Sequence, residues 1–227
     1  MPILLQFLLI LFSQTTQGHI SHGYPLCPHP IIDLNDPDRF QLVQQVSRAC
    51  KEYGFFQITN HGVQQELCER MMGAITEFFE LPPEEKAQFF TTELTKQVKL
   101  LNYYLKIDGQ DEKVTMRSES FSHPWHPLDD IIHLLPQNPP QEVVAECGEE
   151  VRALINRLLS LISQGLGLEK GVLKKRLAVH TGLSTLAVLR QSEGVGGLQV
   201  IKDGKWVAVD PVPNAFVINI GDQIQVI

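Results

Sequence analysis

Residues 198–222, LQVIKDGKWVAVDPVPNAFVINIGD, carry the clearest structural signal in the chain. Two β-prone runs, 197–202 and 205–209, flank Asp203-Gly204. An Asp-Gly pair between two such runs is a strong signal for a tight β-hairpin. A further β-rich run, Ala215–Ile220, is bounded by turn formers and predicts another strand. The end of the chain is therefore expected to form antiparallel β-structure.

Upstream of this block, short strands and helices alternate. Ile31–Leu34 and Phe55–Thr59 predict strands. Between them a helix is expected to begin with Asn35 or Asp36 as N-cap and Pro37 in its first turn, and to stop at Gly54. The apolar face of this helix is predicted to comprise Phe40, Val43, Val46 and Cys50.

Two more amphipathic helices follow. One precedes Pro82-Pro83 and places Leu67, Met71, Ile75, Phe78 and Phe79 at helical spacing. The longest spans about Gln141–Gly165, with a stripe of Val144, Cys147, Val151, Leu154, Leu158 and Ile162. Residues 91–125 are mixed and polar and receive no assignment, whereas Leu186–Leu189 predicts a strand. The chain is thus expected to be helical over its first three quarters, without internal repeats.

Composition indicates an ordinary globular protein. The 227 residues are 43% hydrophobic and 20% charged, which is enough apolar material for a core. The net charge of −7 has the wrong sign for a general nucleic-acid partner. The longest apolar run, 3–12, is far shorter than the roughly 20 residues of a membrane-spanning helix. Neither nucleic acid nor membrane is therefore expected as a partner.

The beginning of the chain leaves two localisations open. Residues 1–18 imitate a secretory signal, because an apolar stretch precedes small and polar residues. They lack a positively charged start, and Gln17-Gly18 is a poor cleavage site. A cytoplasmic location is therefore expected, with secretion as the alternative.

Cysteine usage favours a reducing compartment. The four cysteines, Cys27, Cys50, Cys68 and Cys147, contain no C-x-x-C pair. The last three fall within amphipathic helical stretches, where a free thiol usually behaves as a small hydrophobe. A disulfide framework is not expected.

Several blocks, taken in order, resemble one enzyme family. They are Pro30–Leu34, the stretch GFFQITNHGV at 54–63, Asn138-Pro139-Pro140 before the long helix, and the C-terminal block from Gly196 to Gln223. This arrangement resembles the plant-type 2-oxoglutarate/Fe(II)-dependent dioxygenases, such as flavonol synthase, hyoscyamine hydroxylase and salicylate hydroxylase-like enzymes.

The resemblance implies an α+β fold. A leader and irregular segment would cover residues 1–29, and a mainly helical N-terminal dioxygenase region residues 30–176. An incomplete double-stranded β-helix, or jelly roll, would cover residues 177–227. The implied activity is that of an oxidoreductase that hydroxylates or desaturates a small plant metabolite with Fe(II) and 2-oxoglutarate, and with ascorbate as reductant.

Family members hold iron through a His-x-Asp pair and a distant second His, the facial triad that leaves coordination positions open for 2-oxoglutarate and O₂. The family's Leu and Gln stand six and eleven positions after the first His. His180, Leu186 and Gln191 match that register. His180 therefore corresponds to the first metal ligand, and Gly182 occupies the position of the Asp carboxylate.

Other family positions find no match. The family's Asn-x-Tyr-x-x-Cys-Pro segment, whose Tyr helps to bind 2-oxoglutarate, has no counterpart between Lys175 and His180. The second His and the Arg-x-Ser that grips the distal carboxylate follow the Gln223 position in the family, and no residue here is assigned to them. The strands that should pair with Ala215–Ile220 are expected to be missing, which would leave an apolar edge.

Three hypotheses follow. An active oxygenase would need an exogenous ligand at the Gly182 position. A catalytically inactive relative, or the fragment of an active gene whose exons are wrongly joined, fits the missing ligands better and is the favoured interpretation. A non-catalytic interaction module built on the N-terminal helices is the third.

Other polar groups are interpreted as structural. His123, His126, Asp129 and Asp130 have a superficially ligand-like spacing, but a polar loop before a helix explains them more simply. His61 matches a structural His-Gly turn of the family. The paired phenylalanines at 55–56, 78–79 and 89–90 are expected in the core.

Overall fold

The computed structural model describes residues 28–93, 95–108, 113–123, 130, 132–169, 171–173, 186–191, 198–202, 204–221 and 224. Its helices are α1 (Arg39–Glu52), α2 (Gln65–Glu80), α3 (Pro83–Lys86) and α4 (Gln141–Gly165), with short 3-10 turns at Ala87–Phe89 and Ile132–Leu134. Its strands are β1 (Ile31–Asp33), β2 (Phe55–Thr59), β3 (Lys99–Asp108), β4 (Lys113–Ser122), β5 (Leu186–Leu189), β6 (Gln199–Lys202), β7 (Lys205–Ala208) and β8 (Phe216–Ile220).

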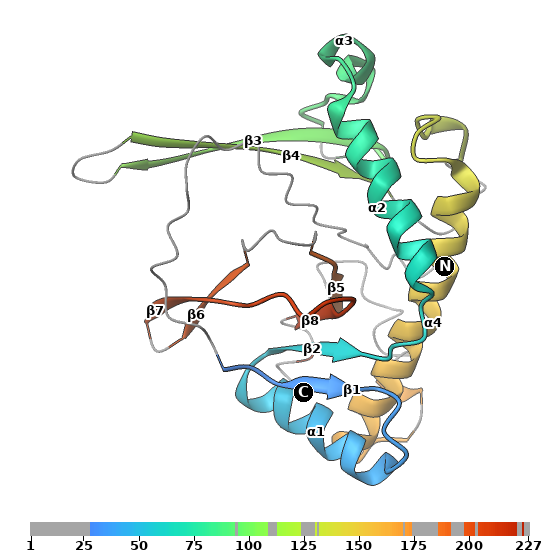
Figure 1. The fold of residues 1–227 in the computed structure, drawn as a ribbon, viewed down its shortest axis with the longest axis vertical. Coiled ribbons are helices and arrows are strands. Elements are labelled where there is room, and N and C mark those ends of the chain that lie inside the picture. The colour runs from blue at the N-terminus through green and yellow to red at the C-terminus, as the bar shows by residue number, and fades with distance from the viewer. Residues whose placement is uncertain are drawn as a thin grey trace.

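A four-stranded sheet joins the two ends of the chain. Its order is β1-β2-β8-β5, with β1 and β2 parallel and β8 antiparallel to both of its neighbours (Figure 1). Ile218 of β8 faces Phe56 on one side and Val188 on the other. The expectation that Ala215–Ile220 would present an unpaired edge is therefore wrong, because β2 from the N-terminal region occupies that edge.

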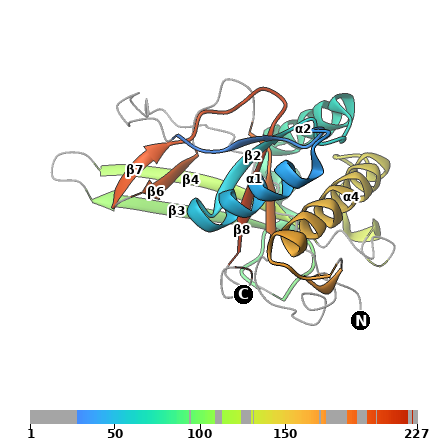
Figure 2. The same cartoon turned by 90° about the horizontal axis from the view of Figure 1, so that it is seen from below.

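The main core fills the space between this sheet and the helices α1 and α4. Figure 2 shows these two helices side by side against the sheet. Alternate residues of a strand point to the same face, and Phe56 and Ile58 of β2 with Phe216 and Ile218 of β8 are buried in this core. A second cluster contains Phe55, Leu189, Val209 and Val217. Three of these residues, Phe55, Leu189 and Val217, directly adjoin strand residues of the first cluster.

The long helix α4 spans the predicted residues, and its predicted stripe is buried apart from Cys147, which is half-buried. At its last residue the helix approaches α1 closely. A Cβ added at Gly165 would lie 2.9 Å from Cβ of Ser47. Glycine at this position therefore permits the contact between the two helices.

The start of α1 differs from the prediction. Asp38 is the N-cap, and its side chain accepts a hydrogen bond from the backbone N–H of Gln41 at 3.0 Å. The carboxylate of Asp36 instead accepts from the N–H of Asp38, which holds the preceding residues in a turn. Phe40 is 75% exposed rather than buried, since the buried face comprises Leu42, Val43, Val46 and Ala49.

The unassigned region contains the hairpin of β3 and β4, so the chain is not helical throughout its first three quarters. Leu100 is fully buried where this hairpin meets the rest of the molecule. Lys86 of α3 donates to Oε2 of Glu119 in β4 at 2.9 Å and to the carbonyl of Phe79 at 2.7 Å. This ion pair, between the buried Lys86 and the half-buried Glu119, fastens the end of α3 to the hairpin.

The predicted C-terminal hairpin is confirmed, with Ile201 facing Trp206 and Gly204 at φ +73°.

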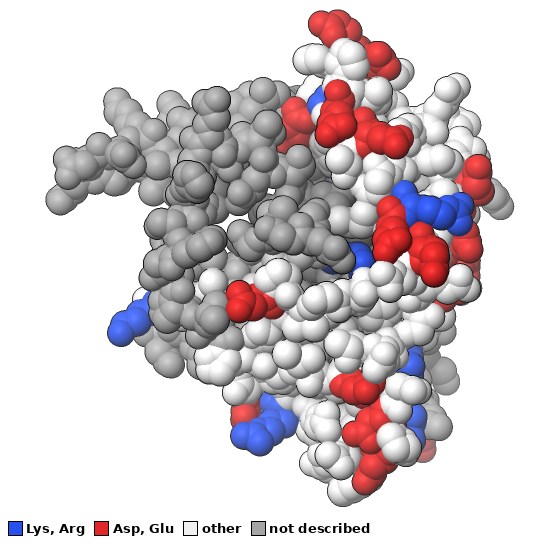
Figure 3. All heavy atoms as spheres, viewed as in Figure 1, with Lys and Arg blue, Asp and Glu red and all other residues white. Residues whose placement is uncertain are grey.

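Acidic and basic side chains are interspersed over the described part of the face in Figure 3, and acidic ones prevail. Of the helices in the described ranges, none combines the length and the apolar character needed to cross a membrane. Residues 1–18, on which the secretory alternative depends, lie outside the described residues.

Candidate functional site

The segments that follow β2 and β5 meet around Asn214, two residues before β8. The carbonyl of Asn214 accepts a hydrogen bond from Nε2 of His61 at 2.9 Å, and the N–H of Val63 donates to Nδ1 of the same ring at 3.2 Å. Because Nδ1 accepts, the ring proton is on Nε2 and the imidazole is neutral. Burial lowers the pKa of His61, and the charge of Arg190 acts in the same direction. His61 is therefore a structural residue, as its turn predicts.

Arg190, directly after β5, extends the same cluster. Its Nη2 donates to Oδ1 of Asn214 at 3.2 Å, and its Cζ lies 5.8 Å from the ring centroid of Phe216, a cation–π contact. The ring of His61 lies against Phe216 with a centroid separation of 4.4 Å. The Arg190 side chain is only 7% exposed. A guanidinium is thus held inside the protein by two uncharged neighbours.

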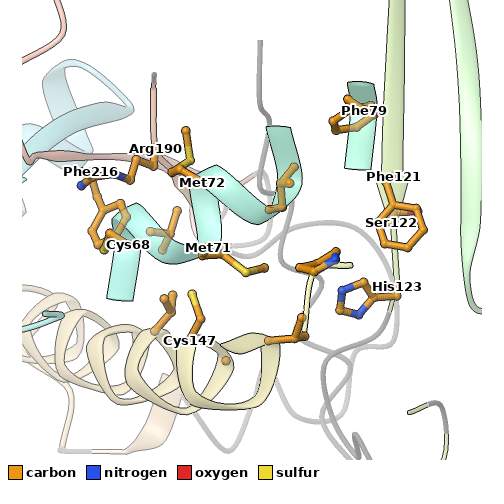
Figure 4. Close-up of a pocket in the computed structure, with 16 residues that line it drawn as sticks. Cys68, Met71, Met72, Phe79, Phe121, Ser122, His123, Cys147, Arg190 and Phe216 are labelled. Atoms are coloured by element: carbon orange, nitrogen blue, oxygen red, sulfur yellow. The ribbon is translucent and has the colours of Figure 1, made fainter. Parts of the chain in front are cut away.

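A cavity of about 90 Å³ lies next to Arg190, between α2 and α4 (Figure 4). Figure 4 shows Arg190 and Phe216 at one end, Phe121 and His123 at the other, and Met71 and Cys147 between them. The described lining residues are Cys68, Met71, Met72, Ile75 and Phe79 from α2; Phe121, Ser122 and His123 from the end of β4; Pro139, Val144, Cys147, Gly148 and Val151 from α4 and the residues before it; and Val188, Arg190 and Phe216 from the sheet. The described walls are mostly apolar, and among the described lining residues Arg190 carries the fixed charge.

The cysteines in this cavity are not activated. Burial raises the pKa of the Cys68 thiol, and burial together with the nearby Cys68 raises that of Cys147 to about 12. Only the thiolate acts as nucleophile or metal ligand. Cys50, Cys68 and Cys147 are all free, as predicted, and they serve as small apolar side chains. Cys27 lies outside the described residues.

The predicted metal positions, His180 and Gly182, lie outside the described residues, as do His126 and Asp129. His123 lines the cavity, whereas Asp130 is exposed. Within the described ranges no three His, Cys, Asp or Glu side chains converge as a metal site would require.

The sequence prediction overlooked Arg190. A signal was available, because residues 186, 188 and 190 lie on one face of an extended segment. A charged residue therefore continues an otherwise apolar face.

Comparison with known proteins identifies the family. Residues 29–144 match the family described as non-haem dioxygenase in morphine synthesis, N-terminal, and residues 163–227 match the 2OG-Fe(II) oxygenase superfamily. The chain belongs to the plant 2-oxoglutarate/Fe(II)-dependent dioxygenase family. The resemblance seen in the sequence is confirmed, and so is the α+β fold class with a jelly-roll core.

Similar members of this dioxygenase family include Protein DOWNY MILDEW RESISTANCE 6 of Arabidopsis thaliana, 35% identical over 86% of this chain and 64% of the relative. Flavanone 3-dioxygenase 2 of Oryza sativa subsp. japonica is 36% identical with the same coverage. The crystal structure of JOX2 in complex with 2OG, Fe and JA matches with a TM-score of 0.62 at 28% identity, over 89% of this chain and 67% of JOX2. The chain spans about 64% of the length of the first two relatives.

Position 182 bears on the iron that the dioxygenase family implies. A facial triad requires two imidazoles and one carboxylate. His180 can supply one imidazole, but glycine at position 182 has no side-chain oxygen. The described residues offer no alternative cluster of ligands.

Proposed function

We propose that this chain is a folded dioxygenase relative that does not itself carry out the 2-oxoglutarate-dependent oxidation. Gly182 carries this proposal, because it stands in register with His180, Leu186 and Gln191 at the family's carboxylate position. The family ancestry makes a small organic metabolite the expected class of ligand. His180 is proposed as the vestige of the first metal ligand.

The loss of the carboxylate has a direct chemical consequence. The carboxylate is the anionic member of the facial triad and offsets part of the charge of Fe(II). Imidazole ligands do not supply this negative charge, and second-shell hydrogen bonds orient existing ligands rather than replace an absent carboxylate. Without bound iron, 2-oxoglutarate has no metal to chelate. The coupled decarboxylation is then not expected.

The test measures Fe(II) retention by equilibrium dialysis under anaerobic conditions, and succinate release from 2-oxoglutarate in the presence of Fe(II), ascorbate and O₂. For the unmodified chain we expect that neither Fe(II) retention nor succinate release exceeds the level measured without protein. Succinate release that depends on Fe(II) and disappears in His180→Ala would overturn the proposal.

A matched variant tests the register itself. Gly182→Asp places a carboxylate two residues from His180, so it is expected to raise Fe(II) affinity at least tenfold, provided that His180 is intact. The double variant His180→Ala/Gly182→Asp is the control, because it carries the new carboxylate without the imidazole. Equal Fe(II) affinity of the two variants would show that position 180 is not a vestigial ligand.

A second candidate function is binding without catalysis. The fold favours it, since β8 is paired on both edges and the core between the sheet and the helices is continuous. A metabolite-binding or regulatory role requires only such a scaffold and a pocket. Saturable binding of a small molecule in the absence of Fe(II) would support this role, and the absence of any such binding would contradict it.

A further inference from the structure

Among the described residues, the cavity between α2 and α4 holds a cation, Arg190, but no anion. No carboxylate among the described residues lies within ion-pair distance of Arg190, and its hydrogen bond goes to the neutral amide of Asn214. None of the described lining residues is Asp or Glu. Buried charges in proteins are normally paired, because an isolated ion inside the protein loses its hydration. The described part of the chain therefore gives Arg190 no carboxylate of the kind that a buried guanidinium normally pairs with.

The positive charge of Arg190 influences the cavity walls. Burial raises the pKa of Cys68, and the charge of Arg190 acts to lower it. For His61, burial and the charge of Arg190 both lower the pKa. Two side chains on different elements thus experience this charge. An anion that entered the cavity would experience it as attraction, strengthened by the apolar surroundings.

The rest of the cavity is suited to an apolar body. Met71, Met72 and Phe79 line it from α2, and thioethers adapt to irregular ligands and pack favourably on aromatic rings. One water needs about 10–15 Å³ of such space, so the volume of about 90 Å³ corresponds to about six to nine waters. A ligand of about as many non-hydrogen atoms is the matching size.

We propose that this cavity binds a small organic acid that has one carboxylate and an apolar, preferably aromatic, body, with Arg190 as the carboxylate anchor. The planar guanidinium matches the geometry of a carboxylate. The ring of such a ligand would lie among the side chains of α2 and α4. This inference is independent of iron and of position 182.

A dicarboxylate such as 2-oxoglutarate fits less well. Its second charged group would lie against the apolar wall formed by Met71 and Cys147, where no described cation faces it. Burying an unpaired carboxylate is costly. The cavity is therefore expected to prefer a monocarboxylate to 2-oxoglutarate.

The experiment uses isothermal titration calorimetry of the metal-free chain with benzoate, its neutral counterpart benzamide, acetate and 2-oxoglutarate. Benzoate is expected to bind at least tenfold more tightly than benzamide, a factor that corresponds to about 1.4 kcal/mol. Acetate, which lacks the ring, and 2-oxoglutarate are both expected to bind more weakly than benzoate. Equal binding of benzoate and benzamide, or no binding of benzoate, would refute the proposal, and tighter binding of 2-oxoglutarate would refute the ligand class.

Two variants and a control locate the anchor. Arg190→Gln can keep the hydrogen bond to Asn214 but loses the charge, so it is expected to abolish the preference for benzoate. Arg190→Lys is expected to restore part of it. Arg152→Gln removes an exposed arginine of α4 that pairs with Glu149, and should change nothing.

A preference that survives in Arg190→Gln would place the carboxylate elsewhere and contradict the assignment. Circular dichroism establishes that each variant is folded. If Arg190→Gln does not fold, the comparison of benzoate with benzamide on the unmodified chain decides the question.

Discussion

The side-chain amide of Gln57 ties the N-terminal region to the C-terminal segment, and its removal should measurably loosen the fold. Gln57 is 1% exposed in β2. Its Nε2 donates to the carbonyl of Asp210 at 2.6 Å, and its Oε1 accepts from the N–H of Val212 at 3.1 Å. Gln57→Met keeps the length of the side chain but removes these two bonds, as well as the contact of Nε2 with Nε2 of His29.

The expected loss follows from these two bonds. A buried polar group left without a partner costs about 1–3 kcal/mol. Asp210 is exposed and Val212 is half-buried, so water can replace part of each bond. The lower end of the range therefore applies to each group, and the free energy of unfolding should fall by about 2 kcal/mol. For a chain of this size, the melting temperature should fall by about 4–8 °C.

Urea denaturation followed by circular dichroism at 222 nm measures this loss. Gln65→Met is the matched control, because Gln65 is exposed and, among the described residues, its amide bonds to Glu69, one helical turn away. The control should stay within about 0.5 kcal/mol of the unmodified chain. Equal stability of the two variants would refute the role given to the Gln57 amide.

Three further predictions concern the packing and the titration of single side chains. Gly165→Ala should destabilise the chain by about 1–3 kcal/mol in urea denaturation, despite the better helix propensity of alanine, because the new methyl group collides with Ser47. Adding Ser47→Gly to this variant should restore the lost stability. If the stability is not restored, the collision with Ser47 is not the cause of the loss. Because burial lowers the pKa of His61 below 6.5, the unfolded chain binds more protons just below that pH, so stability should fall as the pH decreases from about 6.5. His61→Gln should remove this dependence while the exposed His133→Gln keeps it, and identical stability–pH profiles would contradict the assignment. Burial raises the pKa of Cys50 to about 11, so its alkylation by iodoacetamide at pH 8 should be slow and should accelerate in urea, as mass spectrometry of the modified peptides can establish.

The sequence predicted best those elements whose periodicity is reinforced by clear ends. The strand Phe55–Thr59 and the helix Gln141–Gly165 lie where the pattern placed them. The hairpin at Asp203-Gly204 also follows from local turn chemistry. In each case the local preference for a helix, strand or turn agrees with the burial of the residues in the fold. A short window of sequence is then sufficient to predict the element.

The failures share a cause, which is that the deciding contact is distant in sequence. The pairing of β8 with β2 depends on residues more than 150 positions apart, as the bond between Gln57 and Val212 illustrates. The cavity beside Arg190 needs α2, α4 and the sheet in their final positions. In the β3–β4 hairpin, Phe121 packs on Phe78 of α2 with a centroid separation of 4.7 Å, a contact that local periodicity does not reveal.

The four-stranded sheet, which joins the two ends of the chain, has a consequence for folding during synthesis. Val212 and Gln57, which bond to each other, are separated by 155 residues. At a synthesis rate of about 5–20 residues per second, β2 leaves the ribosome about 8–30 s before the residues that complete its bonds. Throughout that interval its β8-facing edge is available to other nascent chains. Folding yield in the cell should therefore depend on chaperones that shield this strand until translation nears its end.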